Sequence, residues 1–473
     1  EGGIVERLHR IFKGNLKFIT LAVSVLLILS SARAFADNEN KADGSDKATL
    51  TQNKTTASKN SISLRDCLNQ AIRDNPLLME AGLGAQSGEE VIISAAGKHY
   101  PRLSLDGNYT SRKDPLPYIP AKAINIPPHF SDEFASWNAY MIIPLYQGGQ
   151  IINGVRLAEI RKAVLDDNRE LTRNEIIANV VNTYNKILQL QKLRGASQSS
   201  VEALESLLKN AQQLYKVGRS AKVDLLKVEV QLSNEKQRIL FLDEAIMTSF
   251  ETLRYLMGED YQEHSMMTLS DHLTMQDFRQ ASDPGLAFET AKKKRPEYLI
   301  AQRGVEDAGM SYKISTGKLL PSVGAFAGYM DQYGFDPHHD EANWYTGINV
   351  SIPLFEKSLY SDISRDRILK QKAEKHLQVV ENQIRLDIRS AFSALEESRN
   401  RILSTQKAVE QSRESFRIEE LRYKSRAGAV VDLLLAQAAY VTSEANYSQA
   451  LYDYNAALVA FRKATGTLEE YLQ

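Results

Sequence analysis

The sequence lacks the features of several large classes of protein. It contains one cysteine, Cys67, so an intramolecular disulfide is excluded, and one thiol without a matched motif does not indicate catalysis. We expect this thiol to be a small buried side chain. The formal net charge is only -1, without the strong basic excess that nucleic-acid-binding proteins usually show. No nucleic-acid partner is therefore predicted.

Enzyme motifs are missing as well. No HExxH or GxSxG pattern occurs. Gly97-Lys98 resembles the end of a phosphate-binding loop, but Ile92 stands where that motif needs its earlier glycine. Gly317-Lys318 has the same defect, with Tyr312 at that position. The sequence therefore predicts neither enzyme activity nor a cofactor.

The N-terminus has the features of a secretory signal. Basic residues precede an apolar run from Phe18 to Leu29, and Ala34-Phe35-Ala36 forms a small-x-small cleavage pattern. The run is too short for a membrane-spanning helix, although an uncleaved anchor is the alternative. We predict a signal peptide over residues 1–36 and a polar, disordered lead-in over 37–62. Folded structure should begin at Ser63, which starts a capping-box pattern.

The rest of the chain contains two copies of one unit. Tyr215–Leu226 reads YKVGRSAKVDLL and Tyr423–Leu434 reads YKSRAGAVVDLL, and both lie between long apolar-periodic runs. A repeated corner of this kind indicates internal duplication. Further matched positions are Pro76 with Pro296, Gly97 with Gly317, and Gly258 with Gly466. The predicted repeats are residues 63–258 and 283–466, joined by a polar connector, 259–282, and followed by a C-terminal tail, 467–473.

Each unit contains two segments whose apolar residues alternate with polar ones, as in strands with one apolar face. We predict strands at about 102–112 and 136–145 in repeat 1, and at about 322–332 and 344–354 in repeat 2. Tilted strands of this length can cross a bilayer. The turn-rich segment between the last two strands contains His338 and His339, which we interpret as polar loop residues rather than metal ligands.

The only two tryptophans, Trp137 and Trp344, occupy the same place in each unit, where the chain re-enters a strand. With Tyr109 and Tyr329 they are predicted to form an aromatic girdle at the membrane interface. The alternative is that the tryptophans anchor the core of a soluble sheet. Four strands cannot close a membrane barrel, so several chains would have to share one. Two chains would give eight strands, and three would give twelve and room for a channel.

The sequence also predicts helices of unusual length. No proline occurs from about Gly149 to Val217, where apolar residues form a helical seam, and about 68 residues make a rod of about 100 Å. Two shorter helices of that unit, at about 76–98 and 222–257, run in one direction and nearly match the long helix when stacked end to end. Each unit would have strands at one end, a corner at the other, and a two-layer helical wall between them.

This plan resembles the TolC-type outer-membrane efflux protein family, also called outer membrane factors, over nearly all of residues 63–466. The resemblance implies a mainly α fold with four β-strands per chain and long antiparallel coiled-coil helices that form an α-barrel. It also implies a homotrimer whose strands share a twelve-stranded membrane β-barrel. The alternative, from another class, is a soluble periplasmic coiled-coil scaffold or adaptor.

In function, the resemblance implies the exit duct of a tripartite efflux or type I secretion system. The duct would lie in the outer membrane of Gram-negative bacteria, in contact with its lipid, and extend into the periplasm. Its implied partners are a periplasmic adaptor (membrane fusion) protein and an inner-membrane transporter of the RND, ABC or MFS type. The resemblance does not indicate which substrate is exported.

The two corners would form the periplasmic tip, where this family closes its tunnel. The resemblance assigns gate or constriction roles to Tyr423 and Asp432 in the second corner and to Asp224 in the first. A ring of carboxylates from symmetry-related chains would select cations. The simpler alternative is that both aspartates cap the returning helices. A gating arginine of the family falls at Gly428 here, so that particular contact is not carried over.

The turns of the two corners are the candidate adaptor-docking residues. In the first corner the turn consists of Gly218, Arg219, Ser220 and Ala221, and in the second of Arg426, Ala427, Gly428 and Ala429. The usual corner glycine is present as Gly218 but is replaced by Arg426 in the second corner. Gly428 is expected to supply the turn there instead. Because the residues within the corners differ, we expect the two corners to play unequal parts in the gate.

Overall fold

The computed structural model describes residues 61–118, 129–259, 267–276, 284–335 and 338–472. The chain divides into Glu1–Ser58 and Lys59–Gln473, and every described residue belongs to the second unit. The predicted signal peptide and most of the predicted lead-in lie outside the described residues. Within the described ranges, no helix combines the length and the apolarity needed to cross a membrane.

The helices occur in the same order in both halves of the chain. The first half contains α3 (Leu64–Asp74), α4 (Pro76–Gly97), α5 (Gln150–Lys216) and α6 (Lys222–Met257). The second half contains α7 (Pro284–Lys294), α8 (Pro296–Gly317), α9 (Lys357–Lys424) and α10 (Val430–Thr465). Each half places two strands between its second and third helices. The internal duplication predicted from the sequence is therefore confirmed.

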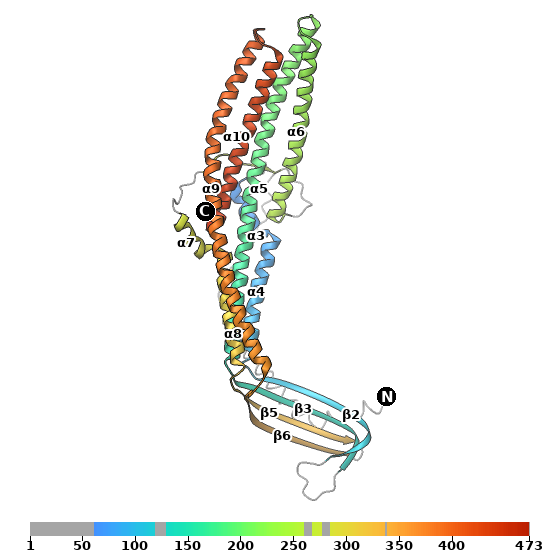
Figure 1. Ribbon diagram of the computed structural model, residues 1–473. Coiled ribbons are helices and arrows are strands. Elements are labelled where there is room, and N and C mark those ends of the chain that lie inside the picture. The colour runs from blue at the N-terminus through green and yellow to red at the C-terminus, as the bar shows by residue number, and fades with distance from the viewer. Residues whose placement is uncertain (1–60, 119–128, 260–266, 277–283, 336–337, 473) are drawn as a thin grey trace, which may run out of the picture. The chain divides into compact units, whose positions relative to one another are not determined.

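The helices pack side by side as a wall (Figure 1). Toward the corners the packing order is α6, α5, α10 and α9, and toward the strands it is α4, α5, α8 and α9. The long helices α5 and α9 therefore run through both parts of the wall. Two shorter helices stacked end to end lie along each long helix, as the sequence predicts: α4 and α6 along α5, and α8 and α10 along α9.

The stacking junctions bring together residues that match between the repeats. Gly258 follows α6 and Gly466 follows α10, both in the left-handed conformation with φ of 75° and 74°. A Cβ atom at Gly258 would lie only 2.3 Å from the carbonyl oxygen of Asp74, at the end of α3. Beside this contact, the Asn75 side chain donates a hydrogen bond to the carbonyl oxygen of Leu256 at 2.8 Å. The end of α6 therefore lies directly against Asp74 and Asn75, where α4 begins.

The four long strands form one antiparallel sheet in the order β2, β3, β5, β6. Their bounds are Arg102–Tyr118, His129–Gln147, Ser322–Phe335 and His338–Ser351. All four are longer than expected. Pairing between β2 and β3 continues past an irregularity between Ser111 and Leu116, where the alternation in the sequence is lost. Pairing between β5 and β6 extends to Phe335 and His338, but β6 ends at Ser351 rather than at 354 as predicted. His338 and His339 were expected in a loop, but their backbone pairs with β5 as the start of β6.

The register gives the sheet one apolar and one polar face. Leu105 lies opposite Ala139, Ala139 opposite Tyr329, and Tyr329 opposite Trp344, so these side chains share a face. The same face carries Leu103, Tyr109, Trp137, Met141, Ile143, Ala325, Ala327, Ile348 and Val350. The opposite, more polar face carries Ser104, Asp106, Asn108, Ser136, Asn138, Asn343 and Asn349, and also Tyr140, Ile142, Phe326, Met330 and Tyr345.

Three segments expected to have little structure are ordered by contacts with the helices. Ser61–Ile62, at the end of the predicted lead-in, form β1, which pairs in parallel with β4 (Thr268–Leu269) in the predicted connector. Tyr454 of α10 donates a hydrogen bond to the carbonyl oxygen of Gln276 at 3.2 Å. The C-terminal tail forms the 3-10 helix η1 (Leu468–Tyr471), whose Leu468 is buried. These contacts depend on tertiary structure rather than on periodicity.

Two apolar clusters lie within the helical wall. The larger one joins residues of α3, α5, α6, α7, α9 and α10 and includes Cys67. Burial raises the pKa of this thiol to about 12, so it is an inert core side chain, as the sequence predicts. The smaller cluster lies near the corners and is described with them below.

Candidate functional site: two corners and an amphipathic sheet

The first corner is closed by a standard helix-ending motif. After α5 ends, Gly218 adopts a left-handed conformation with φ of 71°. Its N–H donates to the carbonyl oxygen of Tyr215 at 2.9 Å, and the N–H of Arg219 donates to that of Leu214 at 2.8 Å. This pair of bonds defines a Schellman motif, which satisfies carbonyl groups that the helix leaves free. Ala221 then precedes α6, so the chain reverses within a few residues.

The second corner uses the same motif with an arginine in place of glycine. Arg426 has φ of 65° and is the only non-glycine residue of the described chain with a positive φ. Its N–H donates to the carbonyl oxygen of Tyr423 at 3.0 Å, and that of Ala427 to Arg422 at 2.8 Å. The expectation that Gly428 supplies the turn is therefore wrong. Gly428 instead allows close approach, because a Cβ atom there would lie 3.0 Å from Cβ of Arg422.

Replacing Arg426 with glycine should stabilise the protein by about 1 kcal/mol, because an L-residue in the left-handed region costs roughly 1–2 kcal/mol. The change should raise the midpoint of thermal or denaturant unfolding. Gly218→Arg is the matched control and should lower it by a similar amount. An unfolding midpoint that falls for Arg426→Gly would show that the arginine side chain contributes more than its backbone conformation costs.

Asp224 and Asp432 occupy equivalent positions in the first turns of α6 and α10. The residues at the N-caps are Ala221 and Ala429, and neither helix has a side-chain cap. Neither carboxylate accepts a hydrogen bond or forms an ion pair with any described residue, so neither one caps its helix in the usual sense. A negative charge in a first turn still interacts favourably with the helix dipole.

Tyr423 connects the two corners. Its ring packs against the smaller apolar cluster, whose buried members come from α5, α6 and α10: Val201, Leu204, Leu207, Val228, Leu232, Val430 and Leu433. Burial and, after it, the charge of Asp224 raise the pKa of Tyr423, so the phenol stays protonated at neutral pH. The structure therefore brings the predicted gate residue Tyr423 near the acid of the first corner, and leaves Asp432 exposed.

The four candidate girdle residues share the apolar face of the sheet. The rings of Trp137 and Tyr329 lie 5.4 Å apart, while Trp344 and Tyr109 are 71% and 60% exposed. Exposed aromatic rings on an apolar sheet face are unfavourable in water and suit a membrane interface.

The described residues include no group of three potential metal ligands, and the side chains of the His338-His339 segment lie outside the described ones.

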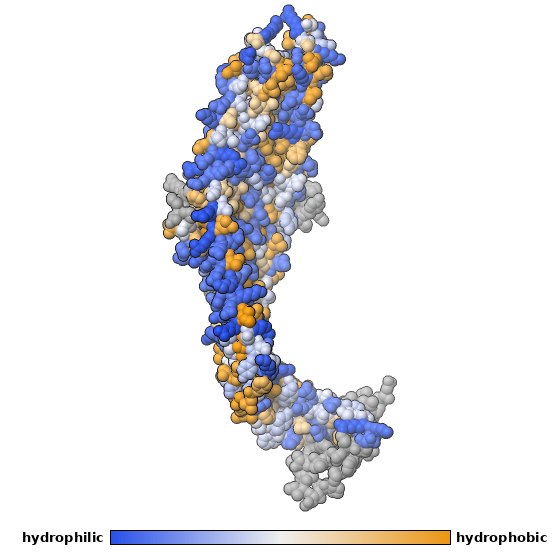
Figure 2. Space-filling model, in the orientation of Figure 1, coloured by the Kyte–Doolittle hydropathy of each residue, from blue (hydrophilic) through white to orange (hydrophobic). Residues whose placement is uncertain are grey.

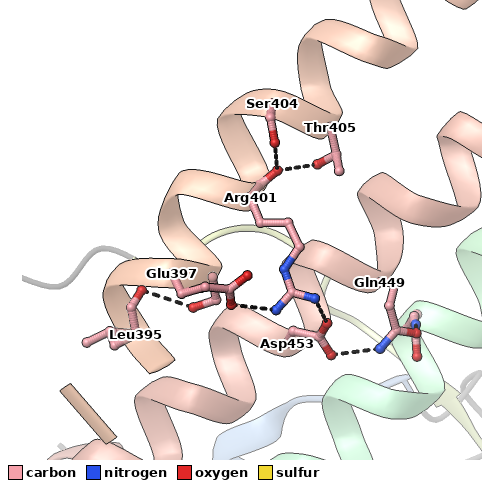
Figure 3. Close-up of polar contacts among 9 residues, drawn as sticks. Leu395, Glu397, Arg401, Ser404, Thr405, Gln449 and Asp453 are labelled. Carbon is pink, nitrogen blue, oxygen red and sulfur yellow. Dashed lines mark hydrogen bonds and ion pairs between the residues drawn. The ribbon is translucent and has the colours of Figure 1, made fainter. Parts of the chain in front are cut away.

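A polar network in the wall was missed by reasoning from the sequence (Figure 3). Arg401 of α9 binds Asp453 of α10 at 3.0 Å, and Gln449 donates to the same carboxylate at 2.7 Å. The side-chain amide of Gln189 on α5 then donates to the side-chain amide oxygen (Oε1) of Gln449 at 2.5 Å. The network therefore joins the two repeats across α9, α10 and α5. The sequence signal for this network is Gln189, a glutamine inside the apolar seam of α5. A fully buried amide needs hydrogen-bond partners, so its position indicates a polar contact within the wall.

A duplicated chain with helical corners at one end and an amphipathic four-stranded sheet at the other defines the class of outer-membrane channel proteins. The chain belongs to the outer membrane efflux protein family, whose family model matches residues 67–259 and 287–467. It is therefore a protein of the outer membrane of Gram-negative bacteria that extends into the periplasm. The alternative of a soluble periplasmic scaffold or adaptor is wrong.

The relatives are distant but match over most of their length. The outer membrane protein TolC of Vibrio cholerae is 21% identical over 417 residues, which cover 86% of this chain and 91% of TolC. The outer membrane efflux protein BepC of Brucella suis is 22% identical over 414 residues, which cover 86% of each chain. The outer membrane channel CmeC of Campylobacter jejuni has a similar fold, with a TM-score of 0.72 at 15% identity, and the match covers 90% of this chain and 93% of CmeC.

Proposed function

We propose that three copies of this chain form the exit duct of a tripartite efflux or type I secretion system. The observation that carries this proposal is the amphipathic sheet, whose outer strands β2 and β6 have no further strand partner among the described residues. Lipid does not tolerate unpaired strand edges, so the edges must pair with those of other copies. Three copies supply twelve strands, which leave room for a channel lined by the polar face.

The aromatic residues of the apolar face would then form the girdle at the membrane interface. Trp344 and Tyr109 project from strands at the two edges of the sheet, and Trp137 and Tyr329 from its centre. In a closed barrel these positions repeat around the whole circumference. The lipid of the outer membrane is the partner of this face.

The helical wall would continue the duct into the periplasm. Its edges are formed by α6 and α4 on one side and by α9 on the other. Both sides carry exposed apolar residues, including Leu240 and Phe241 on α6 and Leu386 and Leu403 on α9. Burying these residues between neighbouring copies would close an α-barrel. The duct itself would carry out no chemistry.

The two corners would form the tip of this tunnel. Their turns, Gly218–Ala221 and Arg426–Ala429, would meet a periplasmic adaptor protein, and Tyr423, Asp224 and Asp432 would form the gate. The adaptor would connect the duct to an inner-membrane transporter of the RND, ABC or MFS type. The transporter would determine whether small molecules or proteins are exported.

The test of this proposal is chemical cross-linking in intact cells, followed by purification in detergent. The expected result is a trimer that carries both an adaptor and an inner-membrane transporter. A protein that stays monomeric, or that inserts into planar bilayers without forming channels, would contradict the proposal. Identification of the co-purifying transporter also assigns the type of export system.

The constriction is tested separately by Asp432→Ala. Exposed carboxylates from three copies near the pore axis would attract cations, so the variant channel should lose about half or more of its cation preference in planar bilayers. Asp453→Ala is a suitable control, because that carboxylate is bound by Arg401 within the wall. Unchanged cation selectivity in the Asp432 variant would remove this residue from the constriction.

A further inference from the structure

The two corners carry very different charge. Residues 209–227 contain five basic residues and one acid, a net charge of +4. The equivalent residues 417–435 contain four basic residues and three acids, a net charge of +1. The sequence repeats the corner but not its electrostatics, so the two corners present different surfaces to a partner.

The difference becomes larger when ion pairs are considered. In the second corner Arg417 binds Glu414, Arg422 binds Glu419, and Lys424 binds Glu420, each at 2.7 Å within α9. The five cations of the first corner form no ion pair or side-chain hydrogen bond with any described residue, and all of them are exposed: Lys209, Lys216, Arg219, Lys222 and Lys227. We call these five residues the basic corner.

Apolar side chains lie among these charges. Val217 is 67% exposed and Val223 is 54% exposed, and Leu226 and Val230 continue the exposed stripe along α6 at helical spacing. The other side of α6 is buried, since Val228 and Leu232 belong to the apolar cluster. Hydrophilic residues also cover the extreme ends of the helices in the face shown in Figure 2, with hydrophobic residues beneath them.

We propose that the basic corner is the electrostatic docking surface for an acidic helical segment of a partner protein. This inference rests on the proposed function of the corners as the tip that meets the adaptor. Opposite charges on the partner would meet the five unpaired cations, and its apolar residues would pack on Val217, Val223 and Leu226. The second corner would add contact area but less attraction, because three of its four cations are already paired with described residues and only Arg426 is not.

A helical protein segment fits this surface better than an anionic membrane does. A membrane-binding helix lies flat in the interface and buries a broad apolar face. Here α6 is packed along α5, and near the corner its exposed apolar residues form a narrow stripe with flanking lysines, consisting of Val223, Leu226 and Val230. A stripe of this width is what one partner helix covers.

Exposed charges of this kind act mainly on the rate of association. They attract the partner over roughly one Debye length, about 10 Å at 0.1 M salt, and their effect decreases as salt rises. Binding through the basic corner should therefore be fast at low salt and strongly salt-dependent. Binding through the paired charges of the second corner should depend on salt much less.

Two charge-reversal variants of the full chain test this inference. The first is Lys216→Glu with Arg219→Glu and Lys222→Glu, and the second is Arg422→Glu with Lys424→Glu and Arg426→Glu. Each purified protein is bound to the adaptor identified by cross-linking, and the association rate is measured at low and high salt. We expect the first variant to lose about tenfold or more in association rate and most of the salt dependence, and the second to lose less than about threefold.

Several controls separate the possible outcomes. Each variant must retain the oligomeric state of the wild type, and the triple change of Lys216, Arg219 and Lys222 to Gln should give a smaller loss in the same direction. Equal losses in both charge-reversal variants overturn the inference while leaving the proposed function intact. Binding of the basic corner to phosphatidylglycerol vesicles in place of the adaptor also overturns it. A wild type that binds no adaptor at all overturns the proposed function itself.

Discussion

Replacing Gly258 with alanine should destabilise the protein severely, by on the order of 3 kcal/mol or more. The new Cβ atom would lie 2.3 Å from the carbonyl oxygen of Asp74 and 2.7 Å from its carbonyl carbon, and backbone atoms cannot move aside as a flexible side chain can. The left-handed φ of 75° adds a further penalty. We expect little folded protein in the outer membrane and a lower unfolding midpoint for the fraction that folds.

The chain offers two graded comparisons for this substitution. Gly466→Ala affects the equivalent junction, but its Cβ atom would lie 2.9 Å from the nearest atom, so a smaller loss is expected. Gly304→Ala, in the middle of α8, meets no atom within 4 Å and should stabilise the helix by about 0.5–1 kcal/mol. If Gly258→Ala leaves the unfolding midpoint unchanged or raises it, as expected for Gly304→Ala, then the close contact of Gly258 with Asp74 is wrong.

The junctions also show which parts of the fold could be predicted from the sequence. Helix spacing and strand alternation are local signals, and duplication makes each signal appear twice, so α6 was predicted at about 222–257 and is observed at Lys222–Met257. The match of Gly258 with Gly466 was visible in the sequence. The reason for the match is that each glycine contacts the residues just before α4 or α8, and only the three-dimensional structure reveals this contact.

Features that depend on distant partners could not be predicted in this way. The connector is polar and aperiodic, and contacts with distant elements hold the part of it that the structure describes: β4 pairs with β1, and Asn455 and Tyr454 donate to the carbonyl oxygens of Thr274 and Gln276. The role of Arg426 depends on the exact residue at which α9 ends. The left-handed residue was predicted at Gly428 and is observed two residues earlier, at Arg426. Likewise, the proximity of Tyr423 to Asp224 joins two corners that lie about 200 residues apart in the sequence.

In the proposed duct, removing the ring of Tyr423 should shift the gate at the corners toward its open state. The ring packs on the apolar cluster that holds α9 and α10 against α5 and α6 near the corners, and it is only half-buried. Its loss in Tyr423→Ala should cost about 2 kcal/mol of closing energy, which corresponds to about 30-fold in the equilibrium between closed and open channels. Single-channel recordings in planar bilayers should show a large gain in open time or conductance.

Tyr215→Ala is the matched control, because Tyr215 occupies the same position in the first corner but is 42% exposed and lies outside the cluster. We expect this variant to open little more than the wild type. Tyr423→Phe keeps the ring and loses only the hydroxyl group, so it should retain most of the closure if packing is the cause. Equal opening by Tyr215→Ala and Tyr423→Ala would mean that the corners loosen non-specifically, and Tyr423 would then have no special part in the gate.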